Sequence, residues 1–561
     1  MHTEHQDHNL QPDLHKKSEK EVSESVHAKN PLKLSAYTTA LIKAWEECYE
    51  KIPISTTRIS VSQTVSFLAF LYEKMRNAVE FREEHLIRRA AIERIIKRRM
   101  LLNENGRDIA EVLIKELLWA RYYENNTLGE EKIADVQTII DKYFFIRNEI
   151  SAGRSTHEQE NIANFILEVL AAEIEENLSS NLRLEAFTNF VYQLIRPYIA
   201  PFNGDTLSRD IQVYIAVEKT FAHSDEPLIR YHLLKLMIPE ITTLNWKSAD
   251  KILSKIYEAY YDIEKYLKSP TFDKIRNYIK KQIPPFLVLQ DVFNQNKNSI
   301  SEILSSDDEL KNKVDMSCRK RYEETKDRLR RMGVRAFIYI ILTKVIFAFL
   351  LEVPYDLYFL EKISYFPIII NVLFPPILMS GILLSVSVPG DENTRRIFNL
   401  IKGFITQNPQ DPSITKNAVR FDKKPKAKGA IFALLFTLFY LFTYLLSFGS
   451  IIYILTRLNF NPISQGIFIF FVALVTFFAF RVISITQEYL VVEKESPLTP
   501  LFDLFFLPII RLGQWLSGEI LTKFNVLIFV FDFIIEMPLK AIVEVIDEWI
   551  KFVKIKKEEI I

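Results

Sequence analysis

Lys344 is the residue in this chain whose position most strongly suggests chemistry. It lies near the middle of an apolar stretch that runs from Ala336 to about Leu351. A cation at the centre of a membrane helix costs about 2.5 to 3.5 kcal/mol, so it normally faces a charged partner or a polar cavity. The alternative is a structural lysine that reaches the membrane surface or forms an ion pair. If the C-terminal segments fold back onto the membrane helices, the acidic partners that we expect are Asp503, Asp532 and Glu536.

A second apolar stretch carries Asn371 and the consecutive prolines Pro375 and Pro376. Consecutive prolines remove backbone donors and kink a helix, and broken helices line the substrate sites of transporters. Proline is also common in membrane helices whose role is structural, because neighbouring groups satisfy the freed carbonyls. These residues, together with Lys344, are the candidates for an intramembrane site.

Motifs of catalytic and cofactor sites are missing from the sequence. It contains no GxxxxGK[ST], GxGxxG, HExxH or GxSxG pattern. The histidines of the N-terminal tail, His2, His5, His8, His15 and His27, lie where nothing would fix the geometry of metal ligands. We therefore expect no catalytic residue, no cofactor and no metal site.

A predicted helix from about Gln63 to Leu102 contains a basic cluster that could bind an anionic surface. Glutamates are interleaved with it, which favours a solvated helical face over a binding site. The basic residues are Arg88, Arg89, Arg94, Lys97, Arg98 and Arg99, and the glutamates are Glu80, Glu83, Glu84 and Glu93.

Two neighbouring features in residues 391–429 suggest contact with anionic lipid. One is a short amphipathic helix with Ile397, Ile401, Phe404 and Ile405 on its apolar face. The other is a set of lysines: Lys423, Lys424, Lys426 and Lys428. Together they would lie against an anionic leaflet, although the lysines could equally serve only to orient the protein in the membrane.

Helical periodicity predicts an all-α fold. Apolar residues recur at helical spacing at Ile162, Phe165, Ile166, Val169, Leu170 and Ile174, and again at Ile252, Ile256, Tyr260, Ile263 and Leu267. Ser299 with Glu302, and Ser306 with Glu309, form capping-box patterns that mark helix starts. The expected organisation is a disordered tail (1–30), a helical domain built as a bundle or an irregular solenoid (31–335), a transmembrane region (336–485) and a C-terminal segment (486–561) of interfacial or re-entrant and amphipathic helices.

The transmembrane region should contain four spans, because a span needs about 20 apolar residues. The predicted spans are about 336–358, 363–388, 430–456 and 458–480, with a basic loop over 391–429 between the second and third. Basic residues before the first span and in this loop far outnumber Lys362 and Arg457 in the two opposite loops. Since cytoplasmic loops are enriched in Lys and Arg, both termini should be cytoplasmic in a cell or inner membrane.

The net charge of +1 gives no reason to expect a nucleic-acid partner, and the two cysteines, Cys48 and Cys318, suit a reducing compartment. We therefore expect a membrane-anchored, non-catalytic interaction or scaffold protein whose helical domain meets a protein partner at the inner leaflet. The alternative is a transporter or channel subunit that uses Lys344, with a pore formed by homo-oligomerisation as an open route. A third hypothesis is an enzyme that acts on lipid, and it rests on location alone.

Overall fold

A computed structural model describes most of the chain, and the regular secondary structure of the described residues is helical. These are 32–50, 57–62, 84–102, 108–202, 204–244, 246–297, 299–359, 363–386, 388–421, 429–491 and 504–518, with a few single positions elsewhere. Within them the only extended pairings are isolated bridges, such as the one between Ile199 and Val419. The all-α prediction is confirmed.

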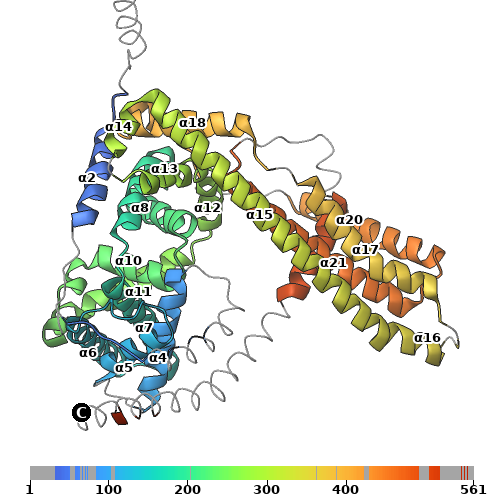
Figure 1. Ribbon diagram of the computed structural model, residues 1–561, viewed down its shortest axis with the longest axis horizontal. Helices are drawn as coiled ribbons and strands as arrows, with labels where there is room; N and C mark the ends of the chain where they lie inside the picture. The colour runs from blue at the N-terminus through green and yellow to red at the C-terminus, as the bar shows by residue number, and fades with distance from the viewer. Residues whose placement is uncertain are drawn as a thin grey trace, which may run out of the picture.

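The N-terminal part of the structure forms what we call the helical domain (described residues 32–306). Its described α-helices are α2 (Ala36–Glu50), α4 (Glu84–Leu102), α5 (Ile109–Trp119), α6 (Glu131–Ser151), α7 (Thr156–Leu178), α8 (Leu182–Ile195), α9 (Thr206–Val217), α10 (Glu226–Met237), α11 (Leu253–Leu267), α12 (Phe272–Lys280), α13 (Pro284–Gln295) and α14 (Ile300–Ser305). Figure 1 shows them gathered at one end of the molecule.

The predicted apolar stripes lie in one core. On α7, all six residues of the stripe from Ile162 to Ile174 are buried, and on α11 Ile256 and Ile263 are buried. Polar caps fix several helix starts, for example Ser155 and Asp225, whose side chains accept hydrogen bonds from Glu158 N and Leu228 N. Ser299 and Ser306 do precede helices, but neither side chain caps its helix.

Four helices are long and apolar enough to cross a membrane: Asp307–Phe359, Tyr365–Leu384, Ala430–Arg457 and Pro462–Ser484. The first combines α15 (Asp307–Phe347), the π-helical turn η5 (Ala348–Glu352) and α16 (Val353–Phe359). The others are α17 (Tyr365–Ser385), α20 (Ala430–Arg457) and α21 (Pro462–Thr486). We call α15 from Ala336 onward, together with η5, α16, α17, α20 and α21, the membrane bundle.

The first span begins inside the helical domain. Helix α15 starts at Asp307, far before the predicted span, and runs diagonally from the helical domain to the membrane bundle (Figure 1). The buried residues Leu310, Val314 and Cys318 belong to the core of the helical domain, whereas Ile340 packs within the membrane bundle. One continuous helix therefore joins the two parts.

Helix α18 (Asp391–Thr406) is the amphipathic helix of the loop between α17 and α20, and it does not face lipid. Ile397, Ile401 and Ile405 are fully buried in the core of the helical domain. The rings of Phe404 and Phe286 stack with their centroids 4.5 Å apart. The prediction that this helix lies against a leaflet is therefore wrong, because its apolar face covers α13 and neighbouring helices.

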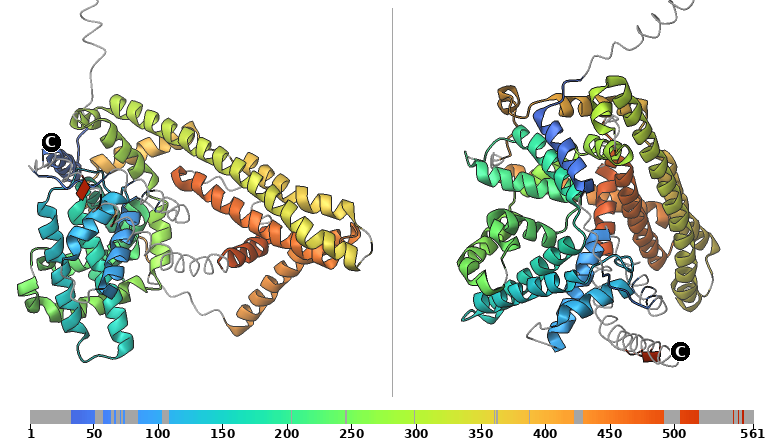
Figure 2. Two further views of the ribbon diagram at one scale, coloured as in Figure 1. Left: turned by 60° about the horizontal axis from the view of Figure 1, so that its bottom comes forward. Right: turned by 60° about the vertical axis from the view of Figure 1, so that its left-hand side comes forward.

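A further helix over residues 504–518 packs against the membrane bundle. The hydroxyl of Ser447 donates to Phe505 O at 2.7 Å, and Ile509 is buried among residues of α20 and α21. Gly513 lies so close to Ala473 that a Cβ at this position would collide with the Ala473 carbonyl oxygen. Figure 2 shows this helix, in dark red, beside α21.

Candidate functional site

The side chain of Lys344 is enclosed in the membrane bundle at 0% exposure. Its Nζ donates to Asn371 Oδ1 on α17 at 2.6 Å. The same Nζ lies 4.2 Å from the centre of the Phe471 ring on α21, a cation–π distance. Lys344 thus meets a polar and an aromatic partner and does not extend to the membrane surface.

Asn371 connects this lysine to a buried carboxylate. Its Nδ2 donates to Glu352 Oε1 at 2.7 Å and to Ser464 O at 3.2 Å. The Ser464 hydroxyl approaches Glu352 Oε2 at 3.5 Å. Glu352 and Asn371 are both 0% exposed, so side chains from three helical segments form one buried polar network.

The network continues to the bundle end that lies away from the helical domain. Asp356 is buried, and its Oδ2 and Oδ1 accept hydrogen bonds from Ser364 N at 2.8 Å and from Asn461 Nδ2 at 2.7 Å. Asn461 Oδ1 in turn accepts from Ser464 N at 2.7 Å, which caps the start of α21. Asp356 therefore links the two short connections at this end.

This arrangement can do two things chemically. A buried cation and carboxylate bridged by an amide attract one another strongly at low dielectric constant, which fixes α15, α17 and α21 in register. Ionisable groups joined by hydrogen bonds within a membrane are also the components of ion and proton pathways. The geometry of Lys344, Asn371 and Glu352 is compatible with both roles.

The structure brings together two of the four predicted intramembrane residues. Lys344 and Asn371 are in contact, whereas Pro375 and Pro376 are buried one turn further along α17 without ending it. Ser380 Oγ donates to the carbonyl of Pro376 at 2.9 Å. The predicted partners Asp503, Asp532 and Glu536, and the lysines Lys423, Lys424, Lys426 and Lys428, lie outside the described residues.

The sequence reasoning missed Glu352 and Asp356. Their signal was their position, two and three helical turns after Lys344 within a run that must continue through Pro354 to span the membrane. Because that run does continue as η5 and α16, both carboxylates enter the bundle.

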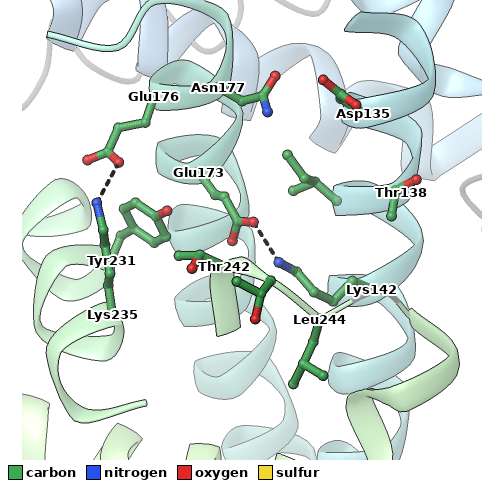
Figure 3. A pocket seen from close by; sticks show the side chains of 12 residues that line it. Asp135, Thr138, Lys142, Glu173, Glu176, Asn177, Tyr231, Lys235, Thr242 and Leu244 are labelled. Carbon is green, nitrogen blue, oxygen red and sulfur yellow. Dashed lines mark hydrogen bonds and ion pairs between the residues drawn. The ribbon is translucent and has the colours of Figure 1, made fainter. Parts of the chain in front are cut away.

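The helical domain has its own buried polar cluster, which lines a cavity of about 540 Å³ (Figure 3). Lys142 Nζ donates to Glu173 Oε1 at 2.6 Å and to Ile241 O at 2.7 Å, and Tyr143 donates to Glu173 Oε2 at 2.6 Å. Burial lowers the pKa of Lys142, although Glu173 opposes this effect. The carboxylate and the ammonium at the wall of this cavity are already paired with each other, which indicates a structural role.

His232 lies nearby between two carboxylates. Its Nε2 is 2.5 Å from Glu176 Oε1, and its Nδ1 is 3.2 Å from Glu218 Oε1. Burial opposes the charged imidazole, but Glu218 and Glu176 outweigh burial and raise the pKa of His232 to about 10. This histidine is therefore charged at neutral pH and serves as a structural cation.

The basic cluster on α4 forms internal ion pairs. The contacts are Arg88 with Glu175 at 3.0 Å, Arg89 with Asp225 at 2.8 Å, Arg94 with Glu73 at 3.0 Å, and Arg98 and Arg99 with Glu116, the latter at 2.7 Å. Lys97 is the one exposed residue of the cluster. Both sequence hypotheses, a solvated face and an anion-binding surface, are wrong for these arginines because they are mostly enclosed and pair with acidic residues, including Glu93 of the same helix at 2.6 Å from Arg89.

No group of three or more His, Cys, Asp or Glu residues that could hold a metal ion occurs in the part of the chain that the structure describes. No protein-family model, curated protein or solved structure matches this chain.

Proposed function

We propose that this protein is a membrane-anchored, non-catalytic interaction protein whose helical domain is held in a fixed pose at the membrane and docks a protein partner there. The observation that supports this proposal is the shared core. Helix α15 belongs to both parts, and α18, from a loop between two spans, is buried in the helical domain. A flexible tether would be enough to anchor a domain to the membrane. The extensive packing therefore favours a role that depends on the orientation of the helical domain relative to the membrane.

A second contact strengthens the connection. Arg321 of α15 pairs with Asp291 of α13, and its Nη1 donates to the Tyr489 hydroxyl at 2.7 Å, just after α21. Asn393 Nδ2 donates to Tyr489 O at 2.8 Å, and Asn393 Oδ1 accepts from Val491 N at 2.8 Å. The end of the fourth span is therefore fastened to α18 and, through Arg321, to α13.

The proposed side of the membrane is the cytoplasm. The helical domain, α18 and residues 487–491 contact one another at one end of the bundle, and this end carries most of the basic residues near the spans. The C-terminal ends of α16 and α20 lie at the other end (Figure 1). This distribution supports a cytoplasmic helical domain under the positive-inside rule.

Photo-crosslinking of the full-length protein in intact cells tests the docking proposal. A fragment that ends before α18 would lose part of the core, so the full chain is required. Crosslinkers at the exposed leucines Leu207 and Leu236 should yield the same protein adduct, and a crosslinker at Tyr358, at the opposite end of the bundle, should not. No protein adduct from either leucine would contradict the proposal.

The buried polar network supports a second candidate, a transporter or channel subunit. Under this hypothesis, Lys344→Leu and Asn371→Leu would each abolish ion flux in reconstituted vesicles while the protein still assembles. Flux that is absent from the unmodified protein, or unchanged in both variants, would reject it.

A further inference from the structure

Three arginines form a line on α15 where the helix leaves the helical domain. Arg328, Arg331 and Arg335 have the spacing i, i+3, i+7, which places them on one helix face. Inside the membrane bundle the same face continues as Ile338, Leu342, Ile346 and Phe349, which are exposed by 60%, 58%, 46% and 70%. An exposed apolar face on a spanning helix contacts acyl chains, so the arginines lie in line with lipid.

These arginines are free to bind an external anion. All three are exposed, and no ion pair joins any of them to another described residue. The carboxylates closest in sequence are Glu324 and Asp327, on the same stretch of helix, and Glu324 lies 4.0 Å from Lys320. The arginines of α4 show the contrast, because each of those is paired inside the protein.

The height of the three arginines matches lipid headgroups. Ile340 packs with Met379, Val475 and Val482 in an apolar layer close to the last turns of α17 and α21, and Leu329 and Met332, which alternate with the arginines along α15, pack against this layer. A rise of 1.5 Å per residue separates Arg328 from Arg335 by about 10 Å. The headgroup region on one side of a bilayer is about 5 to 8 Å thick, so the line of arginines crosses it.

We propose that Arg328, Arg331 and Arg335 bind the phosphate groups of anionic phospholipids in the leaflet that faces the helical domain. A guanidinium donates two parallel hydrogen bonds to a phosphate, which favours arginine over lysine for this contact. The acyl chains of the same lipids would lie along Ile338 and Leu342. This site goes beyond the docking proposal and can fail without affecting it.

The opposite face of α15 provides a matched control. Arg319, Lys326 and Arg330 are also exposed. Their face of α15 continues into the membrane bundle as the buried residues Ile340, Lys344 and Ala348. Three charges can thus be removed from either face. Only the first set is aligned with the lipid-facing stripe.

The experiment is native mass spectrometry of the full-length protein released from nanodiscs of equal parts phosphatidylglycerol and phosphatidylcholine. The unmodified protein should retain phosphatidylglycerol preferentially. In R328Q/R331Q/R335Q the preference should fall by about two orders of magnitude, whereas R319Q/K326Q/R330Q should keep it. Equal retention by all three proteins, or an equal loss in both variants, would overturn the proposal.

Two further measurements test whether the triple variant inserts in the wrong orientation and whether the arginines bind free phosphate. The single variant R331Q leaves the other basic residues near the first span to set the orientation, and it should still lower the retention several-fold; unchanged retention would contradict the proposal. Inorganic phosphate at millimolar concentration should not displace the bound lipid. Complete displacement would show that the arginines bind free phosphate in place of a lipid headgroup.

Discussion

At the scale of single residues, the unusual feature is an amide that joins two buried ionisable side chains of opposite type. Lys344 and Glu352 have no direct ion pair within 4.0 Å, and Asn371 donates to one and accepts from the other. Desolvation of each charge is costly, and removal of one partner leaves the other charge buried and unpaired. The network is therefore expected to contribute more to specificity of helix packing than to net stability.

A double-mutant cycle tests this expectation. Lys344→Met and Glu352→Gln should each lower the free energy of unfolding in detergent by about 3 kcal/mol, because each strands a buried charge. The double variant should lose less than the sum of the two effects. Glu361→Gln, at an exposed position near the same end of the bundle, should have little effect. Additive losses in the double variant would show that the two charges are not coupled.

Glu168 gives a pH-dependent prediction for the helical domain. Burial raises its pKa from 4.5 to about 7, although Arg230 at 2.8 Å opposes the shift. A carboxyl with a raised folded-state pKa contributes stability below pH 4.5 that is lost as the pH rises through 7. Above pH 7, Glu168→Gln should therefore be more stable than the unmodified protein by about 2 kcal/mol, measured as a higher melting temperature. The difference should shrink toward pH 4.5.

Glu264 binds the same arginine and provides a control of opposite sign. Burial disfavours its charge, but hydrogen bonding and charge attraction from Arg230 outweigh burial and lower its pKa. Its contribution to stability is present above pH 4.5 and disappears on acidification. Glu264→Gln should destabilise the protein at pH 7 and converge with it at low pH. If the stability difference from the unmodified protein changed with pH in the same way for both variants, the opposite pKa shifts of Glu168 and Glu264 would be contradicted.

At the scale of elements, α18 shows the limit of sequence patterns. Ile397, Ile401 and Ile405 recur at helical spacing, and this periodicity is the same whether the face covers a membrane or a protein core. Only tertiary contacts decide, here the stacking of Phe404 on Phe286 and the hydrogen bond from Thr38 Oγ1 to Ile405 O at 2.9 Å. The helix could be predicted, but its partner could not.

Ile401→Asp tests the burial of α18. A carboxylate in the core should destabilise the helical domain by about 3 kcal/mol or more and make the loop between α17 and α20 sensitive to protease. Asn399→Asp on the exposed face of α18 should change neither property. If Ile401→Asp reduced only lipid binding and left the domain stable, α18 would lie on the membrane after all.

Gly513 tests the packing of helix 504–518 on α21. A Cβ at this position would collide with the Ala473 carbonyl and with Phe477, so Gly513→Val should displace the helix and lower the melting temperature of the purified protein. Gly518→Ala, with open space around its Cβ, should be tolerated. Equal melting temperatures for the two variants would show that the close contact is not present.

At the scale of the whole molecule, the sequence predicts the all-α fold and the four spans to within a few residues, except where α15 begins. Charge-free runs such as 430–456 are unambiguous because hydrocarbon excludes charges. The sequence identifies Lys344 and Asn371 as candidate intramembrane residues, but it does not predict that they contact each other. Glu352 lies inside the predicted span 336–358, but its role was missed because its partners, Asn371 of α17 and Ser464 of α21, are set by tertiary packing that the sequence pattern does not show.

The most direct test of the proposed rigid coupling is the distance distribution between spin labels at Leu236 of α10 and Arg481 of α21. The full-length protein would be measured in nanodiscs, with Cys48 and Cys318 replaced by serine. The shared α15, the burial of α18 and the contact of Arg321 with Tyr489 predict one narrow distribution, which Ile401→Asp should broaden. A broad or multimodal distribution in the otherwise unmodified protein would contradict the claim that the helical domain is held in a fixed pose at the membrane.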